Sequence, residues 1–352
     1  MHAYIPLPRG LSAAVWAERY RRGEVPDASP YGLHKLGDHG IDVTYGEITL
    51  GSIAGRVASS VRYRTDGLEF VEDVLRLRAR RAADVVLAYD ERTGVPATLL
   101  RARRHQPIVL GIGWLTHRAA APRIHGALAR QAMLRATSVF TQSEPVVSLL
   151  HRDWGVPRSR LHYLPVGIDT DFYAVQPDPD PATAVVASAG EDRYRDHPLL
   201  VSAVSQLKAE HPGIHLELAT GLPVELPAGL GTLYRGRLDG KMRDLYRRAS
   251  VVAVALKPTA SGSGLTVALE AMSSGRPLVM TDNPGVSAYV EHGVTGLLVP
   301  PGDTDAFAAA ISQLLSDPAR CAQMGAAAAA RVRERFTSTH MSANLAALVK
   351  SA

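Results

Sequence analysis

The chain has 352 residues, of which 46% are hydrophobic, and this length and composition favour two domains with separate cores. The single cysteine, Cys321, excludes an intrachain disulfide and a thiolate metal cluster. No apolar run is long enough to span a membrane, and the first ten residues lack the layout of a signal peptide, so we expect a cytoplasmic protein. The formal net charge of +5 suits phosphate-bearing ligands and permits peripheral contact with an anionic membrane, whereas the scattered arginines argue against nucleic acid as a partner.

Short apolar runs alternate with helical patterns in the first half of the chain, which predicts a parallel sheet covered by helices. The predicted strands are residues 2–6, 41–45, 85–88, 108–111 and 138–141. The predicted helices open at Ser29-Pro30 or cover residues 68–80, 96–104, 127–135 and 143–154.

Polar and aromatic residues follow two of these strands directly. Asp90 comes after residues 85–88, and Trp114 and His117 come after residues 108–111. Open α/β sheets bind ligands outside the carboxyl ends of their strands, so these residues occupy predicted active-site positions.

A polar, proline-punctuated segment, residues 176–181, is typical of a linker. We therefore predict one domain over residues 1–167 and a second over residues 168–335. In the second, the predicted strands are residues 184–189, 214–218, 232–234 and 251–256, and the predicted helices are residues 242–248, 304–315, 318–335 and 338–350.

The stretch from Lys257 to Asp303 reads as a glycine loop, a helix, a strand and two turns. The loop Ser261–Gly264 precedes a helix from Leu265 to about Ser274, whose free N-terminal amides would bind an anion such as a sugar-diphosphate. Glu270 lies within this apolar helix, where a carboxylate is costly unless it accepts specific hydrogen bonds. A ribose diol would donate two.

This stretch resembles the donor-site signature of retaining glycosyltransferases of the GT-B fold, in glycosyltransferase family 4, also called glycosyl transferases group 1. The resemblance lies in the order GSGL, LEAM, SGRPLV, DNPG and HGVTGLLVPPGD. It implies an α/β protein with two Rossmann-like, doubly wound parallel-sheet domains facing each other across a cleft. It also implies that a final helix, about 336–352, packs back onto the first domain.

For the donor, the resemblance implies that Glu270 holds the ribose, with the diphosphate and base contacted by residues of neighbouring loops. These donor-binding candidates are Gly190, Arg193, Arg195, Arg237, Ser261, Gly262, Ser263, Gly264 and Leu265. Gly262 stands where the family has a sugar-binding glutamate, and Glu191 replaces a phosphate-binding arginine. Guanidinium groups bind phosphate oxygens bidentately, so Arg193 and Arg195 suit that task.

For catalysis, the resemblance implies Arg195 and His117, which matches by position a histidine that the family often carries after this strand. Lys257 is a further candidate because it ends a strand beside the glycine loop. The acceptor-binding candidates are Trp16, Tyr31, Gly32, Asp90 and Trp114. In the family, the loop after the first strand faces the acceptor. Residues 8–29 are therefore either a lid over the acceptor or a plain surface loop with one helical turn.

The leading hypothesis is a retaining glycosyltransferase that moves a sugar from a nucleotide-diphosphate sugar to a hydroxyl or amine of a small-molecule or glycan acceptor. The alanine- and arginine-rich composition hints at secondary-metabolite or envelope glycan synthesis. The resemblance implies that neither a metal nor a resident cofactor is needed. The alternatives are a non-catalytic sugar-nucleotide-binding partner and a nucleotide-sugar epimerase of the same fold.

Overall fold

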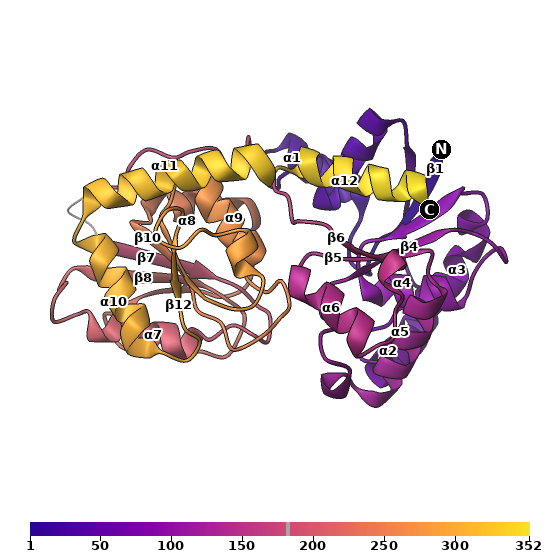
Figure 1. Cartoon of the computed structure of the whole chain (residues 1–352), viewed down its shortest axis with the longest axis horizontal. Helices are drawn as coiled ribbons and strands as arrows, with labels where there is room; N and C mark the ends of the chain where they lie inside the picture. Colours follow the sequence, from indigo (N-terminus) through magenta and orange to yellow (C-terminus); the bar gives the residue numbers. More distant parts are fainter. Residues whose placement is uncertain (181–183) are drawn as a thin grey trace. The chain divides into compact units, whose positions relative to one another are not determined.

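The computed structural model describes residues 1–180 and 184–352, which form two compact units (Figure 1). The first unit comprises residues 1–21, 28–165 and 339–352, and the second comprises residues 22–27 and 166–338. The short segment 22–27 is held in the second unit by backbone groups. Arg243 Nη2 donates to the carbonyl of Gly23 at 2.7 Å, and the Asp27 amide donates to Asp169 Oδ2 at 2.9 Å.

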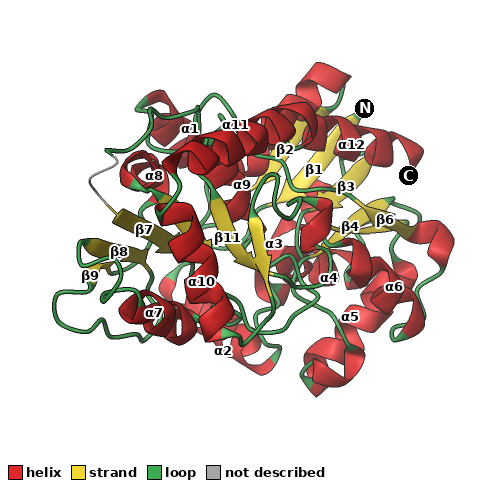
Figure 2. Ribbon diagram, turned by 60° about the vertical axis from the view of Figure 1, so that its left-hand side comes forward, coloured by secondary structure: helices red, strands yellow, loops and turns green. Residues whose placement is uncertain are grey.

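The first unit contains a six-stranded parallel sheet in the order β2-β1-β3-β4-β5-β6. The strands are β1 (His2–Pro6), β2 (Asp42–Gly46), β3 (Val85–Ala88), β4 (Ile108–Ile112), β5 (Ser138–Thr141) and β6 (Leu161–Tyr163). Figure 2 shows β1, β2, β3 and β4 lying side by side. Five of these strands lie where the sequence predicted them, whereas β6 was not predicted. Strands β3, β4 and β5 are buried along their whole length, as expected for strands covered on both faces, but β2 exposes two of its five residues.

Helices cover both faces of this sheet. The helices of the first unit are α1 (Ala13–Arg21), α2 (Ser52–Arg64), α3 (Phe70–Arg80), α4 (Glu91–Leu99), α5 (Arg123–Arg135), α6 (Glu144–Arg152) and α12 (Ser338–Ser351). One face packs Leu87 and Val109 against Leu345 and Val349 of α12, while Val86 on the other face packs against α4.

Two predicted helices of the first unit are wrong. The helix expected at residues 96–104 is α4, which begins at Glu91 because the Asp90 side chain caps it. Pro96 is tolerated inside α4 because the carbonyl of Arg92, which its missing N–H would have bonded, accepts from the amide of Glu69 instead.

The helix expected from Ser29-Pro30 is a 3₁₀ segment, Pro30–His39. Tyr31 and Gly32 have left-handed φ values of 59° and 66°, which interrupt a regular helix. The chain between β1 and β2 also contains α1, in which the structure buries no residue. Helix α2 was not predicted at all.

The second unit contains another six-stranded parallel sheet, in the order β12-β11-β10-β7-β8-β9. Its strands are β7 (Ala184–Ala189), β8 (Ile214–Ala219), β9 (Gly231–Tyr234), β10 (Val251–Val254), β11 (Leu278–Thr281) and β12 (Leu297–Val299). Its helices are α7 (His197–Gln206), α8 (Met242–Arg248), α9 (Leu265–Ser273), α10 (Thr304–Leu315) and α11 (Pro318–Arg335).

The second sheet is also covered on both faces. Val251 and Ala253 of β10 pack with Leu200 of α7 and Ile311 of α10, while Val254 points to the opposite face, towards Gly264 at the start of α9. The expected α/β class, with two doubly wound parallel sheets, is therefore confirmed. Among the described residues, no helix is both long enough and apolar enough to cross a bilayer.

Candidate functional site

In the second unit, a carboxylate joins the loop after β7 to the glycine loop before α9. Asp192 Oδ1 accepts from Ser263 Oγ at 2.7 Å, and its Oδ2 accepts from Arg195 Nε at 2.9 Å. The backbone ties the same loop to the end of β10, where the amide of Lys257 donates to the carbonyl of Tyr194 at 2.8 Å. Asp192 therefore fixes two predicted donor-binding residues relative to each other, although the sequence did not single it out.

Arg195 is buried, and burial lowers the pKa of its guanidinium group despite the attraction of Asp192. Its Nη1 atom has no hydrogen-bond partner within residues 1–180 and 184–352. Gly190 makes room for this side chain, because a Cβ at that position would lie 2.0 Å from Arg195 Nε. A buried guanidinium with an unsatisfied donor is suited to an anionic ligand, since ion pairs to phosphate are bidentate and strong.

The glycine loop depends on one glycine in particular. Gly264 has a φ of +80°, and a Cβ there would lie 2.9 Å from Val254 Cγ1, so only glycine fits without strain. Gly262, in contrast, is outside the left-handed region, and a Cβ there would approach only Leu265 Cδ1, at 3.1 Å. Ser261 and Ser263 are both buried, and Leu265 is the first residue of α9. The loop thus delivers the amides of α9 to the same place as Ser263.

Glu270 lies on α9 with 9% of its surface exposed. Burial raises the pKa of its carboxyl to about 7, while hydrogen bonds from Tyr246 and Tyr173 and the charges of Arg195 and Arg237 oppose that shift. Tyr246 Oη donates to Glu270 Oε2 at 2.7 Å. A carboxylate can accept about four hydrogen bonds, so two tyrosines leave acceptor capacity for a ligand hydroxyl.

The remaining donor-side candidates have exposed side chains. Arg193 lies over the ring of its neighbour Tyr194, 5.0 Å from the ring centre, and its Nη2 donates to the Tyr194 hydroxyl at 3.2 Å. Lys257 is exposed, although its backbone carbonyl accepts from Asn283 Nδ2 at 3.0 Å. Arg237 is exposed and is close enough to lower the pKa of Glu270. The structure therefore brings together Gly190, Arg195, Ser263 and Gly264. Glu270 lies on α9, the helix that Gly264 precedes.

In the first unit, the carboxyl ends of β3 and β4 meet through Glu91. Its two carboxylate oxygens accept from the amides of Gly113 and Trp114, each at 2.9 Å, and burial raises the pKa of this carboxyl. Trp114 itself is 42% exposed. Asp90, which precedes Glu91, caps α4 and pairs with the guanidinium of Arg92 at 2.6 Å. Glu91, which the sequence did not single out as a candidate, therefore holds the loop that presents Trp114.

Four further candidates, Trp16, Tyr31, Gly32 and His117, lie in the first unit. The ring of Tyr31, next to Gly32, stacks on Tyr89 with 4.2 Å between ring centres, which places it beside the end of β3. His117 is exposed, and its Nδ1 lies 3.0 Å from Asp153 Oδ2, which helps to lower the pKa of that carboxyl after the larger effect of Arg152. Trp16 is half-buried on α1.

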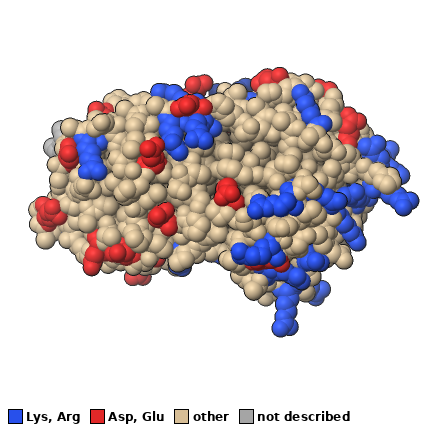
Figure 3. All heavy atoms as spheres, in the orientation of Figure 1, with Lys and Arg blue, Asp and Glu red and all other residues tan. Residues whose placement is uncertain are grey.

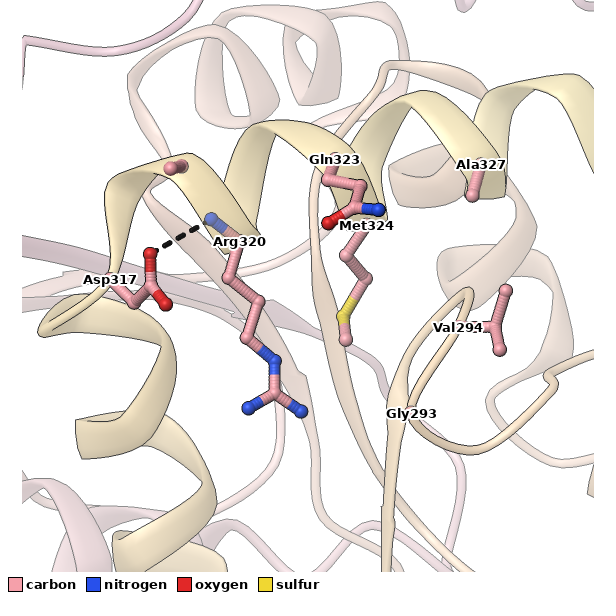
Figure 4. Close-up of a pocket in the computed structure, with 8 residues that line it drawn as sticks. Gly293, Val294, Asp317, Arg320, Gln323, Met324 and Ala327 are labelled. Carbon is pink, nitrogen blue, oxygen red and sulfur yellow. Dashed lines mark hydrogen bonds between the residues drawn. The ribbon is translucent and has the colours of Figure 1, made fainter.

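A separate surface hollow of about 470 Å³ lies in the second unit between α11 and the turn at Gly293 and Val294 (Figure 4). Figure 4 shows Arg320 and Met324 of α11 beside this turn, with Asp317 capping the helix. None of the predicted site residues lines it. Within the described ranges, no three His, Cys, Asp or Glu side chains gather as a metal ion would require.

Two protein-family models match the chain. "Glycosyl transferase 4-like domain" matches residues 8–167, and "Glycosyl transferases group 1" matches residues 181–317.

Among characterised relatives, the chain is 27% identical over 237 residues to D-inositol 3-phosphate glycosyltransferase of Rhodococcus erythropolis, covering 60% of this chain and 53% of that protein. It is 29% identical over 197 residues to the GDP-mannose-dependent alpha-(1-6)-phosphatidylinositol monomannoside mannosyltransferase of Mycolicibacterium smegmatis, covering 49% of this chain and 51% of that protein. The matches thus span little more than half the length of these two relatives.

Solved structures share the fold over the whole chain. HepE of Anabaena in complex with UDP-glucose has a TM-score of 0.72 at 19% identity, with 100% of both chains covered. Sucrose-phosphate synthase from Thermosynechococcus elongatus has a TM-score of 0.77 at 18% identity, with 100% of this chain and 98% of that chain covered. These likenesses establish the fold of both units.

Proposed function

The chain belongs to the group 1 glycosyltransferases with a GT-B fold, and from this we propose that it is a retaining glycosyltransferase that uses a nucleotide-diphosphate sugar. The acceptor would be a hydroxyl or amine of a small molecule or glycan. The relatives named above act on inositol phosphate or a phosphatidylinositol mannoside, according to their names. Polyol and glycoside acceptors are therefore the first to test, in secondary-metabolite or envelope glycan synthesis.

One observation carries the proposal: the buried guanidinium of Arg195, held by Asp192, shares its carboxylate partner with Ser263 at the start of α9. This arrangement places a positive charge beside a helix N-terminus, where backbone amides favour anions. A diphosphate fits such a site. Glu270, further along α9, is then available to accept from ribose hydroxyls.

In the reaction, the bond between the anomeric carbon and the diphosphate oxygen breaks, and the acceptor oxygen or nitrogen bonds to that carbon from the same face. The acceptor proton passes to an oxygen of the leaving diphosphate. Arg195 and the α9 amides stabilise the charge that develops on that diphosphate, which is where fixed donors are most effective. Lys257 and His117 are further catalytic candidates, and no metal or resident cofactor is included in this proposal.

The absence of a glutamate at Gly262 favours one rival, a sugar-nucleotide-binding protein without activity. A nucleotide-sugar epimerase of the same fold is the other. The three functions differ in what they do with a bound donor, and so a single set of assays separates them.

The first assay is a thermal-shift panel of UDP-, GDP-, dTDP- and ADP-sugars. A ligand at a hundred times its dissociation constant adds about 2.7 kcal/mol to the free energy of unfolding, so the true donor should stand out. The selected donor is then incubated with polyol and glycoside acceptors, and nucleoside diphosphate and product are measured.

Acceptor-dependent release of nucleoside diphosphate, with the anomeric configuration of the donor kept in the product, is the expected result. Arg195→Gln should abolish it in a folded protein. Donor binding without any release would favour the binding protein, and conversion of the donor without an acceptor would favour the epimerase.

A further inference from the structure

Helices α2 and α3 of the first unit pack against each other, yet both carry bulky apolar side chains on the side that faces solvent. On α2, Ile53 is 71% exposed, Val57 52% and Tyr63 90%, whereas the only buried residue of that helix is Ala58. On α3, Val74 and Leu75 are about half exposed. A surface helix of a soluble protein normally turns its apolar stripe to the core, so this pair is inverted.

The inversion of α3 has a clear cause, because Asp73, Arg76 and Arg80 have partners inside the protein. Arg80 Nη1 donates to the carbonyl of Ala97, and its Nη2 pairs with Asp73 at 2.8 Å. Arg76 Nη2 donates to the carbonyl of Leu7 at 2.7 Å. With these side chains fixed inwards, Val74 and Leu75 must face outwards, since they lie on the opposite side of the helix.

Arginines surround this outward apolar surface. Arg56 and Arg64 of α2, Arg78 of α3 and Arg81, which follows α3, are all exposed. The two helices expose no acid, and the exposed acid nearest in sequence is Asp66 of the connecting turn.

The formal charge of the whole first unit is also positive. The first unit contains 23 Lys and Arg against 13 Asp and Glu, a formal net charge of +10, whereas the second unit has 16 against 21, a net charge of −5. In Figure 3, Lys and Arg gather over the elements that Figure 1 labels α3, α5 and α6. The formal net charge of the intact chain conceals this division.

We propose that the outward faces of α2 and α3 dock on a lipid bilayer that contains anionic lipids. Exposed Ile53, Val57, Tyr63, Val74 and Leu75 enter the boundary between headgroups and acyl chains, and the surrounding arginines bind lipid phosphates. Apolar residues flanked by arginines, without acids, are typical of helices that lie in a membrane interface. A clustered positive charge also attracts the unit to an anionic surface over a Debye length. The proposal concerns docking alone and does not rest on the enzymatic activity.

The test uses the full chain and vesicle flotation. We expect the protein to float with vesicles of phosphatidylcholine and about 30% phosphatidylglycerol, and not with phosphatidylcholine alone. About 1 M salt should weaken the binding, because it shortens the Debye length to about 3 Å. Two triple variants remove the two components of the surface: Ile53→Ser/Val57→Ser/Leu75→Ser and Arg56→Gln/Arg64→Gln/Arg78→Gln.

The arginine variant should lower the partition coefficient at least tenfold, because each arginine near an anionic surface contributes about fivefold. The serine variant should also lower it at least tenfold, because each CH₂ group buried in the bilayer contributes about fourfold. The matched control is Arg104→Gln/Arg158→Gln/Lys350→Gln, which removes the same charge from exposed positions of the same unit that lie outside α2, α3 and α5. It should retain most of the binding. An unchanged melting temperature shows that each variant is folded.

A fluorescence measurement locates the contact. Tyr63→Trp should shift its emission to the blue on anionic vesicles and be quenched by lipids that carry a quencher in the upper acyl chain. Tyr20→Trp, at an exposed position of α1, should show neither effect. Vesicle binding that is equal in the control and helix variants, an unquenched Tyr63→Trp, or self-association through this face without vesicle binding would each overturn the proposal.

Discussion

Glu270 provides the sharpest test of the donor site, because the pKa of its carboxyl is raised to about 7 in the free protein. If ribose hydroxyls donate to this group, they stabilise its charged form and lower its pKa. Donor binding below about pH 7 must then release a proton from Glu270. Glu270→Gln keeps the shape of the side chain and removes the proton.

The size of the effect follows from the pKa. At about pH 6.5, a group with a pKa of about 7 is protonated in roughly three quarters of the molecules, so binding should release up to about 0.75 proton. At about pH 8.5 it is almost fully ionised, and the release should fall to nearly zero. Affinity for the donor should accordingly rise as the pH increases towards about 7 and then level off.

Isothermal titration calorimetry in buffers of different ionisation enthalpy measures the released protons. The ligand should be an intact nucleotide-sugar, because a free nucleoside diphosphate has a terminal phosphate that itself titrates near pH 6. Glu270→Gln should bind without proton release at either pH. Equal release at both pH values, or the same release from wild type and Glu270→Gln, would refute the assignment of Glu270 to the ribose.

Three further predictions concern neighbouring features. Asp192→Ala should weaken nucleoside diphosphate binding at least tenfold, because the substitution frees the Arg195 side chain and removes a hydrogen bond to a charged group. The affinity for the bare nucleoside should not change. If titrations show equal losses of affinity for both ligands, Asp192 is a general stabiliser of the fold. Gly264→Ala should lower the free energy of unfolding by about 1–3 kcal/mol, because Gly264 has a left-handed φ. Gly262→Glu should melt near the wild-type temperature, because Gly262 does not. Calorimetry that found equal losses of stability in the two variants would contradict this difference. Burial raises the pKa of Asp73 to about 7, so the free energy of unfolding should fall as the pH rises from about 4 to about 7. Asp73→Asn should make that decline shallower in denaturant titrations at several pH values. If the dependence of stability on pH is unchanged by the substitution, another group is responsible for it.

The central strands of both sheets could be predicted from the sequence because each is a short apolar run buried on both faces. Strands β6 and β12 were not predicted, because three residues are too few to give a recognisable pattern. The helices of the first unit were harder to predict than its strands. Helix α4 was misplaced because Pro96 reads as a helix start, and only the structure shows that the amide of Glu69 satisfies the carbonyl that proline leaves free. Helix α2 was not predicted, and the structure shows that it contributes only Ala58 to the buried residues of the unit.

The donor-side residues were predictable where the resemblance supplied an ordered motif, as for Gly264 and Glu270. The family is confirmed by the two domain models, while the roles of individual residues stay predictions. For Arg193 and Lys257 the sequence offers only a position near the end of a strand, and both have exposed side chains in the structure. Position after a strand does not say which way a side chain points.

The residues that the sequence did not reveal share one physical property: each carries a buried or partly buried charge whose partner lies in a distant part of the chain. Asp192 binds Ser263, 71 positions away, and Glu91 binds the amide of Trp114, 23 positions away. Arg76 of α3 reaches Leu7, 69 positions away. Local patterns treat a charged residue as a solvent-facing one, because burial without a partner is so costly. Because distant partners stabilise these charges, local sequence patterns do not identify Asp192 and Glu91 as the carboxylates that fix loops. The inward partners of Arg76 and Arg80 also turn the apolar side of α3 outwards, where it forms a further binding surface.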